Sequence, residues 1–395
     1  MIKKDINTQT SPLPLSSERR GNKEEAILIG IDGNEANVQR KVGISEYAFE
    51  LLKQFEKFQI SNITFQIYLK DNPASDLPKE REGWKYVIVK PGKFWTQLGL
   101  PLYLYTHNPK PDVFFSLTHY SPRFSPVPTA MAVMDLAFLR FPDTFNTSDL
   151  YQLKSWTQYS VKKATRVFTI SEASKNDILK YYQIPEKRVV VTHLGIKPLQ
   201  HMNDQLSVTD VKKKYSLQSP YYLFVSTLQP RKNIVKLIEA FAKLKDVKTD
   251  LIIVGKKGWL YEPILAAPEK YNVSERVKFL DFAPNEDLPG LYKGAIAYVF
   301  PSLYEGFGLT LLEAMKYDCP VITSKVSSLP EAGGEAALYV DPESVDSIAE
   351  AMEKITDKTL REKLIAKGHE QIKKFSWEKT ARETLKVLEE VVKNS

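Results

Sequence analysis

The sequence predicts an α/β protein built from two doubly wound, Rossmann-like domains that face each other across a cleft. Apolar runs of strand length alternate with amphipathic stretches of helix length twice over, which is the pattern of parallel sheets covered by helices. From Pro198 to Val211 this periodicity fails and polar residues dominate, so the domain boundary is expected there. A chain of 395 residues that is 43% hydrophobic is long enough for two full cores.

The first domain is expected over residues 26–200, after a polar segment at 1–25 that has the composition of a flexible leader. Its first strand is a near-continuous apolar run, typical of a parallel strand that is buried on both faces. The expected strands cover 26–31, 63–69, 86–89, 113–117, 129–134, 167–170 and 189–192, and the expected helices cover 44–55, 149–163 and 172–182, the last capped by Ser171.

Residues 94–105 are unusually apolar and aromatic. The stretch predicts a core helix broken by Pro101, and an exposed face on it would suit contact with lipid.

The second domain is expected over residues 211–375, followed by a terminal helix at 376–395. The expected strands cover 221–226, 251–254, 277–280, 295–300 and 320–323, and the expected helices cover 234–245, 309–317, 347–356 and a pair from 360 to the end.

The formal net charge of +7 and the isoelectric point near 9.0 predict an anionic partner. Basic residues are not interleaved with aromatic ones as in RNA-binding modules, which argues against nucleic acid and favours phosphorylated ligands or an anionic membrane surface. The one cysteine, Cys319, fits a reducing compartment, and no apolar run approaches the ~20 residues of a membrane span. We therefore expect a cytoplasmic protein whose charge suits peripheral attachment to the inner face of the cell membrane.

The stretch from Pro301 to Glu313 lies between an apolar strand and a helix and carries two glycines and two carboxylates. Gly306 and Gly308 allow a sharp turn or the close approach of a ligand. A helix N-terminus offers free N–H groups and the positive end of a dipole, so it predicts a phosphate site. The simpler interpretation is a capping box between Thr310 and Glu313, with ordinary turn glycines before it.

A basic loop precedes the helix that is expected to begin at Ile234 with Asn233 as its N-cap. Arg231 and Lys232 have the wrong sign for a helix N-terminus, because the dipole repels cations. An anion bound between them and the helix would explain their position, and a solvated basic loop is the alternative. Gly43 opens the first helix and would allow backbone approach to a phosphate or sugar, although a turn is the simpler role for one glycine.

No Asp-x-Asp pair for a divalent cation occurs in the sequence, and the histidines at 107, 119, 193, 201 and 369 are scattered. Neither a Walker-type phosphate loop nor a Gly-x-Ser-x-Gly nucleophile turn is present. We therefore expect no metal site and no cofactor.

Taken together, these stretches resemble the retaining glycosyltransferases of family 4, also called group 1, which have the two-domain GT-B fold. The resemblance covers roughly residues 26–395, and its most specific part is the Glu-x7-Glu spacing between Glu305 and Glu313. The other matching stretches are Gln-Pro-Arg-Lys-Asn at 229–233, Gly-Lys-Lys-Gly-Trp at 255–259, Ser-Ser-Leu-Pro-Glu at 327–331 and Phe-Ser-Trp-Glu-Lys-Thr at 375–380. The last resembles the family's closing helix, which crosses back to the first domain.

The resemblance implies that the first domain binds the acceptor and the second a nucleotide-sugar donor, which is a co-substrate. By this resemblance, Glu313 contacts the ribose of the donor, and Glu305 contacts the sugar together with the backbone of Gly306, Phe307 and Gly308. The backbone N–H groups of Leu309 and Thr310 bind the diphosphate. Arg231 and Lys232 neutralise the charge of the diphosphate. It also implies retention of anomeric configuration.

Two departures from the family pattern concern the first domain. The glycine-rich turn reads Gly43-Ile-Ser45, and Met134 stands where relatives carry a histidine near the donor sugar and acceptor. Asp135 and His119 are the candidates to replace that histidine.

The expected activity is transfer of a hexose, with mannose from GDP-mannose preferred over UDP-sugars, to a carbohydrate or lipid-linked acceptor in cell-surface polysaccharide synthesis. The alternatives are a sugar phosphorylase or nucleotide-sugar epimerase on the same fold, and an inactive nucleotide-sugar sensor, which Met134 would favour.

Overall fold

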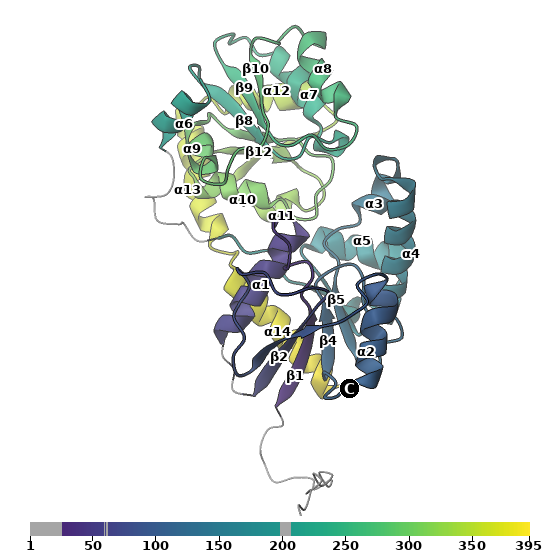
Figure 1. Ribbon diagram of the computed structural model, residues 1–395. Coiled ribbons are helices and arrows are strands. Elements are labelled where there is room, and N and C mark those ends of the chain that lie inside the picture. The colour runs from purple at the N-terminus through teal and green to yellow at the C-terminus, as the bar shows by residue number, and fades with distance from the viewer. Residues whose placement is uncertain (1–25, 59, 61, 198–206) are drawn as a thin grey trace, which may run out of the picture.

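The computed structural model describes residues 26–58, 60, 62–197 and 207–395, which form two α/β units placed one above the other (Figure 1). The expected leader at 1–25 and most of the expected boundary lie outside the described residues.

The first unit contains a parallel sheet of seven strands in the order β3-β2-β1-β4-β5-β6-β7. The strands are β1 (Ile27–Asp32), β2 (Ile63–Leu69), β3 (Trp84–Ile88), β4 (Val113–Ser116), β5 (Thr129–Ala132), β6 (Arg166–Thr169) and β7 (Val189–Val191). The helices are α1 (Ile44–Phe58), a π-helical turn (Trp95–Gly99), α2 (Leu100–Thr106), α3 (Ala137–Arg140), α4 (Thr147–Lys163) and α5 (Glu172–Tyr182), with short 3-10 turns at Pro142–Thr144 and Glu186–Arg188.

The second unit contains a parallel sheet of six strands in the order β10-β9-β8-β11-β12-β13. The strands are β8 (Tyr221–Val225), β9 (Asp250–Val254), β10 (Val277–Leu280), β11 (Tyr298–Phe300), β12 (Val321–Ser324) and β13 (Ala337–Val340). The helices are α6 (Val208–Lys214), a 3-10 turn (Pro230–Lys232), α7 (Ile234–Ala242), α8 (Glu262–Lys270), α9 (Leu288–Gly294), α10 (Leu309–Lys316), α11 (Leu329–Gly333), α12 (Val345–Lys354), α13 (Lys358–Ile372) and α14 (Trp377–Lys393). The α/β expectation is therefore confirmed.

Helix α14 belongs to the second half of the sequence but packs against α1, β1 and β4 of the first unit, whereas α13 packs against α10 of the second (Figure 1). The chain therefore passes between the units twice, and the described residues of the first crossing, which end at Lys197, lie beside the start of α14 through the bridge between Ile196 and Ser376. A Cβ atom added to Gly195 would lie 2.0 Å from the Trp377 backbone nitrogen, so only glycine fits at this crossing.

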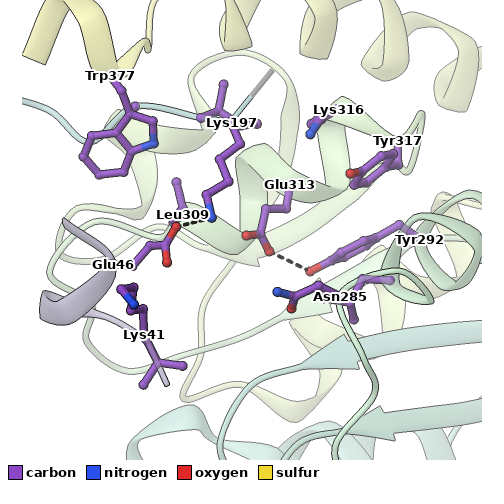
Figure 2. Close-up of a pocket in the computed structure, with 14 residues that line it drawn as sticks. Lys41, Glu46, Lys197, Asn285, Tyr292, Leu309, Glu313, Lys316, Tyr317 and Trp377 are labelled. Carbon is purple, nitrogen blue, oxygen red and sulfur yellow. Dashed lines mark hydrogen bonds and ion pairs between the residues drawn. The ribbon is translucent and has the colours of Figure 1, made fainter. Parts of the chain in front are cut away.

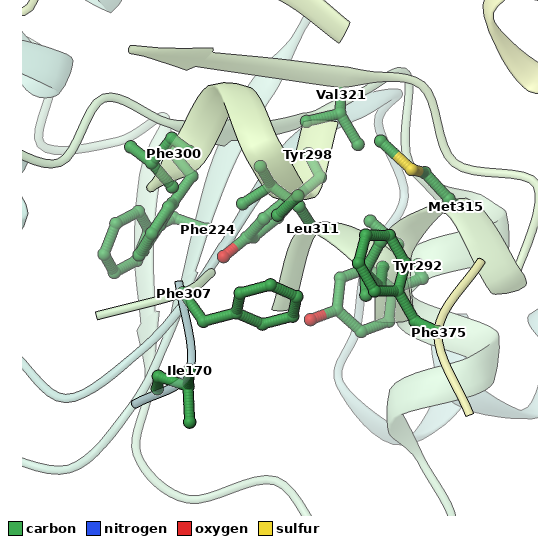
Figure 3. Close-up of a cluster of buried hydrophobic side chains, with 14 of the residues drawn as sticks. Ile170, Phe224, Tyr292, Tyr298, Phe300, Phe307, Leu311, Met315, Val321 and Phe375 are labelled. Carbon is green, nitrogen blue, oxygen red and sulfur yellow. The ribbon is translucent and has the colours of Figure 1, made fainter. Parts of the chain in front are cut away.

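The buried apolar side chains of the two units meet around Phe307 (Figure 3). Its ring lies 5.8 Å from His193 and 5.4 Å from Phe375, measured between ring centroids. Tyr298, Phe300 and the residues of α10 form the second unit's core beside it. This contact fixes the loop between β11 and α10 against the first unit.

Local structure adds detail at two places. Helix α6 begins at Val208, capped by the Ser207 hydroxyl, and therefore starts inside the stretch where the domain boundary is expected. The helical stretch at 94–105 changes from a π turn to α2 next to Pro101, which lies in the first turn of α2.

Among the described residues, no helix is long and apolar enough to cross a bilayer.

Candidate active site

The two loops that the sequence singled out follow neighbouring strands of the second sheet. The basic loop follows β8 and the glycine loop follows β11, and these strands are paired at the point where the strand order reverses. In doubly wound sheets the carboxyl ends of the strands at such a point line the ligand-binding crevice.

Glu305 lies at the centre of a buried ionic cluster built from these two loops. Its Oε1 atom lies 2.6 Å from the Lys232 ammonium and 3.1 Å from the Arg231 guanidinium, and it accepts a 2.6 Å hydrogen bond from the Ser302 hydroxyl. Burial alone would raise the pKa of Glu305, but the two cations outweigh burial, so its pKa is lowered and the carboxylate stays ionised. Burial lowers the pKa of Lys232 although Glu305 opposes that shift, and the Asp135 carboxylate interacts electrostatically with both Lys232 and Arg231.

The N-terminus of α10 adjoins this cluster and carries no side-chain cap. Gly308 is the N-cap, with a φ of 103° that disfavours any other residue. The Thr310 hydroxyl accepts a hydrogen bond from Tyr298, and Glu313 lies 3.5 Å from the Tyr292 hydroxyl. The capping-box interpretation is therefore wrong, because Thr310 pairs with Tyr298 of β11 and Glu313 with Tyr292 of α9.

Asn233 occupies the expected N-cap position of α7 but does not cap the helix through its side chain. Its amide instead donates to the carbonyl groups of Pro301 and Pro342, so it ties the basic loop to the glycine loop.

Glu313 lines a cavity of about 270 Å³ between the two units (Figure 2). Lys41 and Glu46 come from the first unit, Lys197 comes from the segment that leaves it, and Trp377 begins α14. Burial raises the pKa of Glu313 to about 7, so this carboxylate titrates near neutral pH. Among the residues that line this cavity, only Glu313 and Leu309 were predicted as site residues from the sequence, since no short motif marks the others.

Gly43 lies at the start of α1, next to Val42 of the same cavity. Its φ is +58°, and a Cβ atom added there would meet no atom within 4 Å. The turn role is thus observed, and the space beside it is open to a ligand.

Asp135 and Met134 form the wall of the first unit that faces the glycine loop. A Cβ atom added to Gly306 would lie 3.1 Å from the Asp135 carboxylate, so the two walls are in direct contact here. Asp135 accepts a 2.9 Å hydrogen bond from the Ala137 amide, and the Met134 carbonyl accepts one of 3.0 Å from Ser174.

His119 follows β4 and interacts electrostatically with Asp135. Burial lowers the pKa of this histidine more than Asp135 raises it, so the ring is neutral at pH 7. Its Nδ1 atom is buried and has no hydrogen-bond partner among the described residues. The structure thus brings together the two side chains expected to replace the missing histidine.

Two further side chains of the second unit hold the first unit in place, and sequence reasoning assigned neither a role. The Tyr304 hydroxyl donates to Asp177 at 2.9 Å and accepts from the Leu136 amide at 3.2 Å. The Glu331 carboxylate accepts hydrogen bonds of 2.7 and 2.9 Å from the amides of Glu172 and Ala173, at the N-terminus of α5. Such long-range pairs leave no local signal in a sequence.

A second cavity of about 360 Å³ lies in the first unit, at the carboxyl ends of its central strands. Both polar side chains and aromatic rings line it, among them Asp32, Asn34, Lys70, Trp95, Gln97 and Trp156. Burial raises the pKa of Asp32 to about 6, despite two hydrogen bonds from Asn34. Hydrogen-bonding groups beside flat rings suit a sugar, which has both polar edges and apolar faces.

Within the described part of the chain, no three His, Cys, Asp or Glu side chains lie close enough together to hold a metal ion.

Residues 208–371 match the family model described as "Glycosyl transferases group 1". The O-antigen chain mannosyltransferase B of Escherichia coli is 33% identical over 256 residues, which cover 64% of this chain and 67% of the relative. The chain belongs to the group 1 glycosyltransferases.

A second relative of this glycosyltransferase is the serotype-specific mannosyltransferase WbdA of Escherichia coli, 32% identical over 228 residues. The match covers 56% of this chain but only 28% of WbdA, so the matched part of the chain corresponds to about a quarter of that protein's length.

Among solved structures, sucrose-phosphate synthase from Thermosynechococcus elongatus superposes with a TM-score of 0.72 over 93% of this chain and 100% of that one, at 18% identity. This likeness concerns the fold, and with the two facing parallel-sheet units it confirms the GT-B expectation for this glycosyltransferase.

Proposed function

We propose that this glycosyltransferase moves a mannosyl group from GDP-mannose to a carbohydrate or lipid-linked acceptor, with retention of configuration and without a metal ion, in the synthesis of a cell-surface polysaccharide. The named activity of the two Escherichia coli relatives supports mannose and a polysaccharide product. The observation that carries the proposal is the buried cluster of Glu305, Arg231 and Lys232 beside the uncapped N-terminus of α10, directly opposite Asp135.

The donor diphosphate fits at the N-terminus of α10, with the backbone N–H groups of Leu309 and Thr310 as donors. Arg231 and Lys232 lie where negative charge develops as the bond from the anomeric carbon to the phosphate oxygen breaks. These fixed positive groups are held by the protein before the reaction begins. We therefore assign them the charge stabilisation that a metal ion supplies in other transferases.

The nucleoside extends from the diphosphate into the cavity beside Glu313, whose carboxylate is the acceptor for the ribose hydroxyls. Glu305 and the backbone from Gly306 to Gly308 contact the sugar, which lies at the edge of the contact between the glycine loop and Asp135. In front-face substitution the acceptor oxygen bonds to the anomeric carbon on the side from which the phosphate leaves, and the acceptor proton passes to a phosphate oxygen. The configuration at the anomeric carbon is then retained.

His119 and Asp135 take the place of the histidine that relatives carry at the position of Met134. The neutral imidazole of His119 has a free ring nitrogen, and Asp135 is an acceptor next to the sugar site. We assign the acceptor glycan to the second cavity, which opens at the carboxyl ends of the first sheet. The enzyme would act in the cytoplasm, where nucleotide-sugar donors are used.

Mixing the enzyme with a panel of GDP- and UDP-sugars and measuring the release of free nucleoside diphosphate tests this proposal. Release from GDP-mannose, and an α-linked product by nuclear magnetic resonance, is the expected result. A requirement for inorganic phosphate would indicate a phosphorylase, an altered sugar on an intact donor would indicate an epimerase, and tight donor binding with no turnover would indicate a sensor.

A further inference from the structure

The Gly-Lys-Lys-Gly-Trp stretch at 255–259 ends in an exposed aromatic ring that contacts the first unit. The Trp259 side chain is 48% exposed, and its ring centroid lies 5.7 Å from that of Phe145. The two ring planes are inclined by 47°, so the rings touch without stacking and much of the tryptophan surface stays accessible. The donor contacts proposed above use no residue of this stretch. Tryptophan is among the side chains that most often dominate binding energy, so an exposed one between two units points to a ligand.

Close backbone packing fixes this loop against the basic loop that carries Arg231 and Lys232. The Leu228 amide donates a 2.8 Å hydrogen bond to the Lys256 carbonyl, and the Gly258 amide donates one of 3.1 Å to the Leu228 carbonyl. A Cβ atom added to Gly258 would lie 2.7 Å from the Leu228 carbonyl oxygen, so a larger residue would push the two loops apart. The ring that follows this glycine is therefore held in a fixed place relative to the cations of the candidate site.

Phe145 is held by a segment of the first unit that also carries a site residue. It lies on the connection from β5 to α4, between Asp135 and the start of that helix. On the same connection, the Phe141 ring lies 6.0 Å from the Tyr304 ring of the glycine loop, measured between centroids. The two rings of the Phe145–Trp259 pair therefore belong to segments that are tied to the candidate site.

The ring pair and the nucleoside cavity lie at different sides of the second sheet. The cavity is lined by residues of α9 and α10, among them Tyr292 and Glu313, whereas Trp259 leads into α8. Helix α8 packs against α7, and Figure 1 shows these two helices on one side of the second sheet, with α6, α9 and α13 on the other. Helices α3 and α4, which flank Phe145 along the chain, lie on the side of α7 and α8 (Figure 1). A ligand at the ring pair would therefore lie away from the nucleoside, on the acceptor side of the donor sugar.

We propose that the Phe145–Trp259 pair binds a pyranose ring of the acceptor glycan, at a distance from the ring that receives the mannosyl group. The inference rests on the proposed function, which supplies the identity of the glycan. A pyranose has apolar faces that lie on aromatic rings and polar edges that stay in water. The half-exposed tryptophan offers such a surface, and its rigid loop reduces the ordering that binding requires.

Helix α4 connects the ring pair to the cavity assigned above to the acceptor. Gln152 and Trp156 of α4 line that cavity, whereas Phe145 precedes the first residue of the helix, Thr147. From Thr147 to Trp156 the helix rises by about 14 Å, which exceeds the width of one pyranose ring. A glycan of several residues would therefore contact both places, whereas a short acceptor would contact only one.

Initial rates with soluble acceptors of two lengths test the proposal. With GDP-mannose as donor, the KM for α-linked mannotetraose should be at least about fivefold lower than the KM for α-linked mannobiose. Trp259→Ala should raise the KM for the tetrasaccharide to that for the disaccharide, because the distant ring contact is lost. The KM for the disaccharide and the affinity for GDP should not change. These acceptors contain no lipid, so this dependence on length would assign the rings to the glycan.

Three further variants separate sugar binding from packing between the units. Phe145→Ala should have the same effect as Trp259→Ala, and Trp259→Phe, which keeps a ring, should keep most of the preference for the longer acceptor. Val247→Ala is the matched control, since this apolar residue is 69% exposed and lies before β9, at the amino end of the second sheet. It should leave both KM values unchanged.

Equal KM values of the original chain for the two acceptors would overturn the proposal. An equal rise of both KM values in Trp259→Ala, or a fall in kcat alone, would overturn it too, because a merely structural role has that effect.

Calorimetric titration of mannotetraose in the absence of donor separates this inference from the proposed function. Binding that Trp259→Ala weakens at least about fivefold, in a chain that releases no GDP from GDP-mannose, would refute the proposed function alone. Transfer from GDP-mannose with no preference for the longer acceptor would refute the ring-pair site alone. The site would also be refuted if the original chain neither bound mannotetraose nor transferred mannose to it.

Discussion

Replacing Glu313 with glutamine removes a carboxylate whose burial should cost stability at neutral pH. The folded-state pKa of about 7, against 4.5 in the unfolded chain, corresponds to at most about 3 kcal/mol, because one pKa unit is about 1.4 kcal/mol. Glu313 lines an open cavity, so solvent reduces the penalty, and we expect about 1–2 kcal/mol.

The pH dependence has a definite sign. Between pH 4.5 and about 7 the folded state binds this proton more tightly than the unfolded state, so stability falls as the pH rises through that window and is then constant. Glu313→Gln lacks this loss and should unfold about 2–4 °C higher than the original chain at about pH 8, with no difference at about pH 4.

The assay is thermal unfolding of both proteins across the pH range, combined with calorimetric titration of nucleoside diphosphate. Glutamine accepts hydrogen bonds from ribose hydroxyls more weakly than a carboxylate, so affinity at about pH 8 should fall about tenfold. The exposed Glu350→Gln on α12 serves as a control that should change neither measurement. Parallel unfolding curves for Glu313→Gln and the original chain at every pH would refute the reasoning.

Three further predictions concern the phosphate and sugar sites. Donor turnover should persist in excess EDTA, and a complete loss that Mn²⁺ restores would contradict the roles given to the cations and to α10. Lys232→Ala should weaken the binding of nucleoside diphosphate about 10- to 100-fold, whereas Glu305→Gln should lower turnover with little change in that affinity. Calorimetry measures the affinity and initial rates measure the turnover, with Lys243→Ala at an exposed position as the control. Asp135→Asn should lower turnover more than Met134→Ala, which removes only packing; the reverse order in steady-state rates would show that Asp135 is not at the sugar site.

Strong local patterns were enough to predict most of the fold. The strands at 63–69 and 277–280 have the expected bounds, because an apolar run between polar turns marks both ends. β13 and α11 were not predicted. Helix α6 was missed because its exposed face is rich in lysine, and only Val211 among its residues is buried.

Local sequence patterns also predicted the part of the candidate site that belongs to the second unit. The carboxylates, glycines and cations of the second unit lie close together in two short stretches, so a pattern search finds them. Glu331 and Tyr304 act on residues more than a hundred positions away, and their importance depends on how the two units are placed. Nothing in the local sequence determines that placement, so these contacts became visible only in three dimensions.

The side-by-side crossing at Gly195 and Trp377 has a consequence for motion. A rotation of one unit against the other that keeps the contact between Gly195 and Trp377 would pivot there. The cavity beside Glu313 is lined by both crossing segments, so the nucleoside end of the donor would lie near the axis and move little. The sugar end, by Gly306 and Asp135, lies farther along the cleft, where the same small rotation opens a wider gap. A nucleoside diphosphate could thus stay bound while the transferred sugar and its acceptor leave, which orders the release of the two products.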